Sequence, residues 1–88
     1  MRIKEHDCVV LTADLPDEKL AAGDVGTVVH LHKDGKAYEV EFVTLTGQTI
    51  AVVTVEKADV RPVGKREITH ARDLEPATVQ ETPAKYGK

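Results

Sequence analysis

The chain has 88 residues, of which 31% are charged, 41% hydrophobic and 3% aromatic, and this length excludes a second domain of ordinary size. A chain this short buries only about 60% of its unfolded surface, so we expect no deep catalytic cleft. The net charge is -3, and the acidic excess lies within residues 1–63, so the Lys/Arg cluster typical of nucleic-acid binding is missing. A single cysteine and the lack of a long apolar run predict a cytoplasmic protein without membrane contact.

Short apolar runs recur over residues 7–63 with turn-forming residues between them, a pattern typical of an all-β domain. Asp34 and Gly35 favour a tight hairpin, and residues 56–59 are predicted to form one helical or 3-10 turn. Five short strands with a turn before the last one predict a small five-stranded barrel over residues 1–63. The predicted strands are residues 6–12, 25–32, 37–43, 49–55 and 60–61.

Alternation in the second and third strands predicts which side chains face the core. In the third strand, Glu39 and Glu41 are expected to face water, opposite an inner set of Tyr38, Val40 and Phe42. In the second strand, the predicted inner set is Val25, Thr27, Val29 and Leu31.

The fourth strand is apolar on both faces. Ile50 and Val52 lie on one face, and Ala51, Val53 and Val55 lie on the other. A strand of this kind is either covered on both sides or exposes an apolar stripe that needs a partner. We expect Ala51, Val53 and Val55 to lie outside the core and to form this contact stripe.

Residues 64–88 are predicted to form a C-terminal extension. Good helix formers over residues 66–74 place Ile68 and Leu74 on one edge of a short helix, which Pro76 ends. Because so short a helix is marginal in water, its apolar edge must dock, either on the fourth strand of the same chain or on a second copy. The polar residues after Pro76 are expected to be flexible.

The turn at Gly23-Asp24 and the strand that opens Val25-Gly26-Thr27 resemble those of KOW-type and other SH3-like barrels. Together with residues 7–12, 38–42 and 47–49, this segment makes the chain similar to the domain of unknown function 4926 family of short bacterial proteins. The resemblance implies an SH3-like barrel, a fold shared with accessory subunits such as the small subunit of ferredoxin-thioredoxin reductase and the β-subunit domain of nitrile hydratase. Some family members resemble, in their gene arrangement, toxin and antitoxin pairs.

Three further sets of residues have side chains that could bind a metal ion or take part in catalysis. His30 and His32 share a strand face and could reach one metal ion, with His6 nearby, although a stable site needs three or four ligands and solvent-facing histidines fit equally well. Cys8 is expected to be buried as a small hydrophobe rather than to act as a nucleophile.

Glu39 and Glu41, about 7 Å apart along the strand, resemble an acid–base pair. A solvated face is the simpler interpretation, because like charges also discourage edge-to-edge aggregation. We therefore predict no catalytic residue, no cofactor and no metal site.

These patterns predict a non-enzymatic protein-interaction module, either antitoxin-like or immunity-like or a small accessory subunit. Its partner is another protein or a second copy of this chain. The alternative is a KOW-like nucleic-acid-binding domain that uses the turn at residues 23–27, but an aromatic stacking platform is missing because Tyr38 and Phe42 point inward. The candidate contact residues are Ala51, Val53, Val55, Glu39, Glu41, Ile68 and Leu74.

Overall fold

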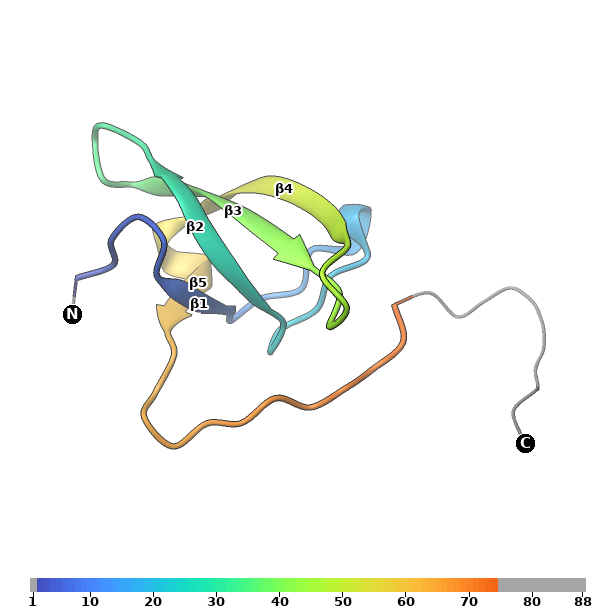
Figure 1. The fold of residues 1–88 in the computed structure, drawn as a ribbon. Helices are drawn as coiled ribbons and strands as arrows, with labels where there is room; N and C mark the ends of the chain where they lie inside the picture. Colours follow the sequence, from blue (N-terminus) through green and yellow to red (C-terminus); the bar gives the residue numbers. More distant parts are fainter. Residues whose placement is uncertain (1, 75–88) are drawn as a thin grey trace, which may run out of the picture.

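The computed structural model describes residues 2–74, and these form one antiparallel sheet of five strands (Figure 1). The strand order across the sheet is β4-β3-β2-β1-β5. The predicted all-β class, the number of strands and the 3-10 turn before the last strand are confirmed. The elements are β1 (Cys8–Leu11), η1 (Pro16–Glu18), β2 (Val25–Leu31), β3 (Ala37–Val43), β4 (Thr49–Glu56), η2 (Lys57–Asp59) and β5 (Val60–Pro62), where η denotes a 3-10 turn.

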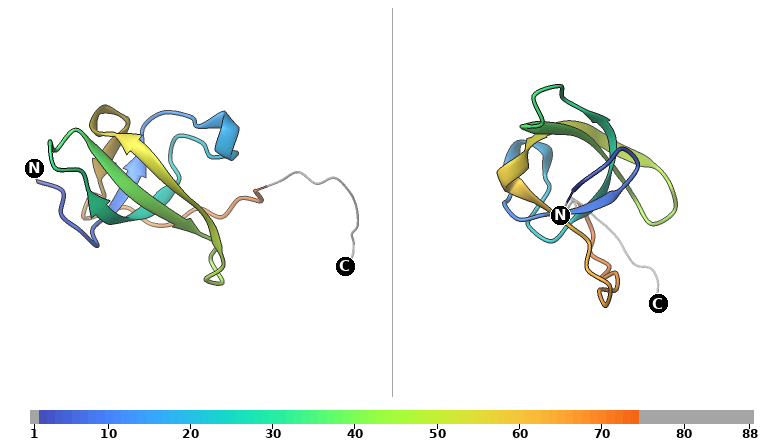
Figure 2. Two further views of the ribbon diagram at one scale, coloured as in Figure 1. Left: turned by 90° about the horizontal axis from the view of Figure 1, so that it is seen from above. Right: turned by 90° about the vertical axis from the view of Figure 1, so that its left-hand side faces the viewer.

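The sheet curls around its core but is not closed into a barrel, so that part of the prediction is wrong (Figure 2). Strands β4 and β5 stand at its two ends, and no ladder joins them within residues 2–74. Strand β5 has only three residues and ends at Pro62, which has no N–H to donate. The last strand is therefore too short to bridge the gap to β4.

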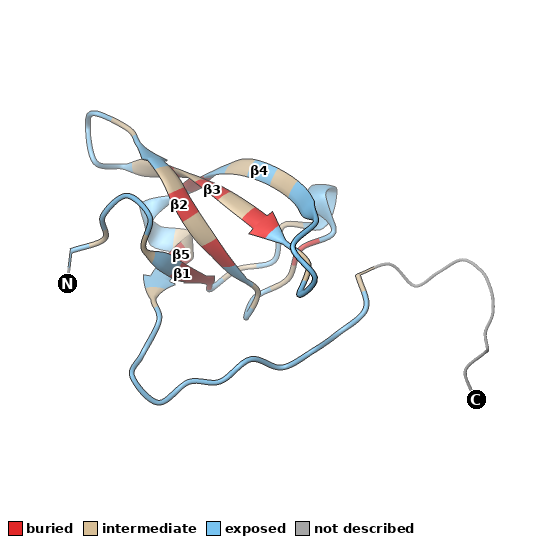
Figure 3. Ribbon diagram, in the orientation of Figure 1, coloured by how far each residue is buried: buried red, intermediate tan, exposed pale blue. Residues whose placement is uncertain are grey.

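All five strands contribute buried residues to one core (Figure 3). Tyr38, Val40 and Phe42 of β3 all point into it, as their alternation predicts. Leu20 reaches the core from the loop between η1 and β2, where two backbone hydrogen bonds between Leu15 and Leu20 fold the loop back on itself. The core residues are Val9, Leu11, Leu20, Val28, Tyr38, Val40, Phe42, Val55 and Val60.

The predicted inner face of β2 is wrong. Gly26 and Val28 face the core, whereas Val25 and Leu31 are exposed. Two features explain the inversion. At the start of the strand Gly26 takes the inward position, where a side chain would collide with β3, and this residue has no apolar side chain to signal it. Further along, the register shifts between Val28 and His30, so one strict alternation does not hold along the whole strand.

The predicted outward stripe on β4 is also wrong, because Ala51, Val53 and Val55 face inward. Val55 is only 2% exposed, and Val53 packs against the core cluster. The outer face instead carries Ile50 and Val52. Since both faces of β4 are apolar, alternation alone could not decide which one the core would take.

The predicted helix at residues 66–74 is absent: residues 63–74, called the strap below, contain no helix. The strap leaves β5 and runs outside the sheet toward the loops at its opposite end (Figure 1). Nine residues gain too few helical hydrogen bonds to offset the entropy of ordering them, and polar contacts to the sheet hold the strap in another shape. The predicted flexible segment after Pro76 lies outside the described residues.

Candidate protein-docking groove

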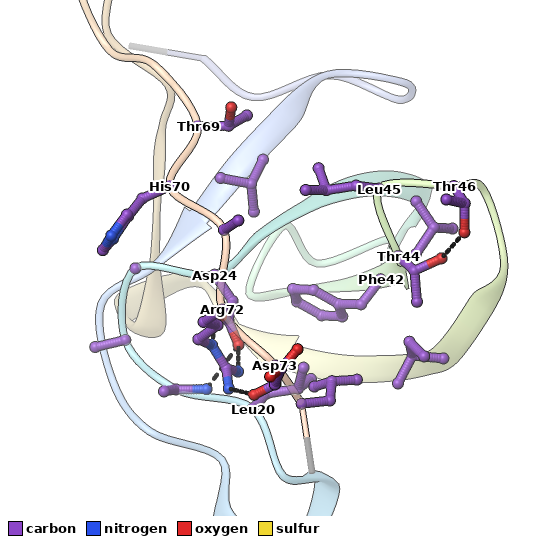
Figure 4. Close-up of a pocket in the computed structure, with 18 of the residues that line it drawn as sticks. Leu20, Asp24, Phe42, Thr44, Leu45, Thr46, Thr69, His70, Arg72 and Asp73 are labelled. Atoms are coloured by element: carbon purple, nitrogen blue, oxygen red, sulfur yellow. Dashed lines mark hydrogen bonds and ion pairs between the residues drawn. The ribbon is translucent and has the colours of Figure 1, made fainter. Parts of the chain in front are cut away.

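A groove of about 760 Å³ opens between the strap and the end of the sheet. Three segments that are distant in sequence line it: residues 20–25 before and at the start of β2, residues 42–46 at the end of β3, and residues 68–74 of the strap. Figure 4 shows the Phe42 ring inside the groove and Leu45 above it. Ile50 of β4 completes the wall. The groove is thus assembled by the tertiary fold, not by one local motif.

The groove is apolar at its rim. Leu45 is 77% exposed at the tip of the β3–β4 turn, and Ile68 is 93% exposed on the strap. Val25, Val43 and Ile50 are also exposed along the same lining. Scattered apolar residues are ordinary on a protein surface, but several large ones around a single concave site are typical of a contact surface.

The β3–β4 turn presents Leu45 on a hydrogen-bonded backbone. The Thr44 N–H donates to the Gln48 carbonyl at 2.8 Å, and the Gln48 N–H donates to the Thr44 hydroxyl at 3.0 Å. Gly47 has a φ of 94°, a conformation that suits glycine and closes the turn. Leu45 therefore projects from a turn that its own hydrogen bonds close.

An ion pair with two hydrogen bonds ties the far end of the strap to the loop before β2. Arg72 donates from Nε to Asp24 Oδ1 at 2.9 Å, and from a terminal nitrogen to Asp24 Oδ2 (Figure 4). The Ala21 N–H donates to the same carboxylate at 2.9 Å. Partial burial alone would raise the pKa of Asp24, but these hydrogen bonds and the Arg72 charge outweigh it and lower the pKa.

A second two-point contact ties the near end of the strap to β5. The Arg61 guanidinium donates to both carboxylate oxygens of Glu67, at 2.9 and 2.7 Å, and the Gly64 N–H donates to Glu67 at 2.6 Å. The hydrogen bonds from Arg61, followed by that from Gly64, lower the pKa of Glu67 to about 2. Planar pairs of this kind fix orientation as well as distance, so the strap is held at two points along its length.

The strap brings one of its two predicted contact residues into the groove wall and leaves the other at the rim. Leu74 is partly buried and lines the groove, while Ile68 stays open to solvent. Neither docks as part of a helix. Sequence reasoning missed Leu45 and Ile50. An apolar residue at a turn tip between polar neighbours was the signal that could have found Leu45.

Glu39 and Glu41 lie on the outer face, as predicted. The Thr54 hydroxyl donates to Glu39 at 2.7 Å, His32 Nε2 lies 2.8 Å from the same carboxylate, and the Thr49 hydroxyl donates to Glu41 at 2.7 Å. The hydrogen bond from Thr54, with that from His32, lowers the pKa of Glu39. A carboxyl group stabilised in its charged form is poorly suited to act as a general acid near neutral pH.

The histidine pair and the cysteine have plain environments. The rings of His30 and His32 are 5.7 Å apart and meet edge to face. Within residues 2–74, no group of three or more potential ligands is placed to hold a metal ion. Cys8 is exposed at the start of β1, so the prediction that it is buried is wrong. Its neighbour in the chain, Val9, takes the inward position instead.

The fold and this groove define a small β-sheet protein with an apolar surface between the sheet and the strap, which two ion pairs hold in place. The DUF4926 family, described as a domain of unknown function, matches residues 5–62, which is 58 of the 88 residues. The chain therefore belongs to the DUF4926 family. No curated protein and no solved structure matches it. Among residues 2–74 there is no helix long and apolar enough to cross a membrane.

Proposed function

We propose that this protein is a non-catalytic interaction module that binds a partner protein through the groove beside the strap. The observation that carries the proposal is the apolar rim: Leu45 of the β3–β4 turn and Ile68 of the strap, the two most exposed large hydrophobic side chains described, both line one groove. A partner that covers both would remove this surface from water, which is the main source of affinity in most protein associations.

The charges of the groove favour an apolar contact over an ionic one. Asp24 and Arg72 already neutralise each other across it, so neither is free to select a charged ligand, and Asp73 is the one further carboxylate of the described lining. A partner would instead insert an aliphatic or aromatic side chain beside Phe42 and Ile50. The half-buried carboxylates Glu39 and Glu41 on the outer face would add a weaker attraction toward a basic partner.

Two kinds of partner fit a small module of this family, namely a cognate toxin and a larger enzyme for which the chain acts as an accessory subunit. We further propose that the domain is an open relative of SH3-like modules that acts in the cytoplasm. The support for the fold relationship is the antiparallel order of five strands with a 3-10 turn before the last one.

An enzymatic role receives no comparable support. The carboxylates of Asp24 and Glu39 have lowered pKa values because their neighbours stabilise the charged form. General acid catalysis near neutral pH requires the opposite shift. Binding is thus the function that the groove supports best.

The experiment is a comparison of partner capture by matched variants of the full chain. Leu45→Asp and Ile68→Asp each place a charge on the rim at a solvent-exposed position, so the fold is retained. Val63→Asp is the control, because Val63 is also exposed but does not line the groove. We expect the wild type and the control to retain one specific protein from the native host, and both rim variants to bind it at least about tenfold more weakly.

Purified partner and calorimetry then give the affinities directly. Equal binding by all four proteins would refute the groove as the docking surface. Tight, steeply salt-dependent binding to single-stranded RNA, with no retained protein, would instead establish the nucleic-acid alternative.

A further inference from the structure

The two edges of the sheet differ in how they are protected against pairing. Strand β5 is three residues long and contains Arg61 and Pro62, features that discourage another strand from adding to an edge. Strand β4 is eight residues long, and residues 49–55 include no charged residue, no proline and no glycine. A long, β-branched and uncharged edge of this kind is a template for strand pairing.

The outer edge of β4 has no strand partner among residues 2–74. Its ladder partner is β3, and β4 is the terminal strand of the sheet. The η1 turn lies across a small hollow from Val53, but the backbone hydrogen bonds from Leu15 to Leu20 close within that loop. Alternate N–H and C=O groups along β4 therefore face outward without a strand to satisfy them.

We propose that a second copy of this chain pairs with β4 through its own β4, antiparallel and about a two-fold axis at Val52. This goes beyond the proposed function: Val52, at the axis, does not line the groove, and Ile50 is the residue of this contact that also belongs to the groove wall. In this register Ile50 faces Thr54 of the other copy and Val52 faces its own counterpart, all on the outer face of the sheet. Val52 is 56% exposed in the single chain, so pairing removes its side chain from water.

The charges agree with this register. The one charged residue of β4, Glu56, falls opposite Gln48 of the second copy, so no like charges meet across the pair. Because β5 is protected and only β4 is open, the pairing uses the same edge on both copies and stops at two. A second copy therefore satisfies the edge and closes the assembly, whereas a chain with two open edges would add further copies.

The test is the oligomeric state of the full chain by analytical ultracentrifugation, for the wild type and for Val52→Lys, Val52→Glu and Val63→Lys. We expect the wild type and Val63→Lys to dimerise with the same concentration dependence. Val52→Glu sets two carboxylates beside each other at the axis, next to Glu41 of each copy, and raises the dimer dissociation constant at least about tenfold. Val52→Lys weakens the dimer less, because Glu41 of the same chain faces position 52 across the β3–β4 ladder and offsets part of the repulsion. Circular dichroism checks that every variant keeps its sheet.

An equimolar mixture of Val52→Lys and Val52→Glu is the decisive experiment. At a two-fold axis, Lys faces Glu in the mixed pair, so we expect a heterodimer that is tighter than either variant alone. A wild type that stays monomeric up to millimolar concentration would overturn the proposal, whether β4 is then covered by another protein or by the rest of the chain. Unchanged dimerisation of Val52→Glu, or no heterodimer in the mixture, would also overturn it. These outcomes are independent of partner capture through Leu45 and Ile68.

Discussion

Replacing Gly26 with alanine tests the packing of β2 against β3. The added Cβ would lie 2.5 Å from Val40 Cγ1, 2.8 Å from Phe42 Cε1 and 2.9 Å from the Glu41 carbonyl oxygen. All three distances are shorter than real Cβ contacts, and the carbonyl belongs to the backbone of a paired strand that cannot turn aside. The new methyl group must therefore push β2 and β3 apart.

Overpacking of this kind costs about 1–3 kcal/mol, and three simultaneous collisions place Gly26→Ala near the upper end, at about 3 kcal/mol. For a domain of this size, 1 kcal/mol shifts Tm by about 4–8 °C, so we expect a fall of more than about 10 °C. Urea denaturation followed by circular dichroism gives the free energy of unfolding, and calorimetry gives Tm.

Gly35→Ala is the matched control. Gly35 has a φ of 71° at the tip of the β2–β3 hairpin, and a Cβ there would meet no atom within 4 Å. Only backbone strain acts on this variant, and it costs about 1 kcal/mol. If Gly26→Ala lost no more stability than Gly35→Ala, the assignment of Gly26 and Val28 to the core face of β2 would be refuted.

Three further predictions concern the strap, β4 and β1. The pKa of Glu67 falls from an ordinary 4.5 to about 2, because its charged form is stabilised by Arg61. Its contact with Arg61 is therefore complete above about pH 4.5 and is lost as the pH falls through 2. A carboxyl NMR titration with a midpoint near 4.5 would contradict the contact. Val55→Ala should lower the free energy of unfolding by about 2 kcal/mol and Val52→Ala by less than about 1 kcal/mol, and equal losses in urea denaturation would reverse the faces of β4. Cys8 should react with a thiol reagent at the rate of an accessible thiol in the folded protein, and protection until unfolding would show that it is buried.

The strands were predictable because local signals determine them. Alternating side chains in β3 and the Asp34-Gly35 turn mark a hairpin that needs no information from elsewhere in the chain. Which faces of β2 and β4 point into the core could not be predicted, for two different reasons. In β2 the inward face begins with Gly26, which gives no apolar signal, and a register shift after Val28 breaks the alternation further along. Strand β4 is apolar on both sides, so only the packed structure shows that Val55 is inside.

The C-terminal strap shows how tertiary contacts override local propensity. Residues 66–74 contain good helix formers, yet Glu67 pairs with Arg61 and Arg72 pairs with Asp24, which is 48 residues away in the chain. No local pattern could reveal the second pair. For the same reason the groove was not predictable, since its walls come from three separate segments. Of the predicted contact residues, Leu74 lines the groove and Ile68 lies on its rim. They were predicted as one edge of a helix, and that helix is absent.

Site-specific photo-crosslinking in the native host tests the docking groove most directly. A photoreactive residue is placed at position 45, on the rim, and in a separate protein at position 63, which is exposed but outside the groove. The account predicts a covalent adduct with one defined protein from position 45 and none from position 63. Adducts of equal yield from both positions, or from position 63 alone, would contradict it.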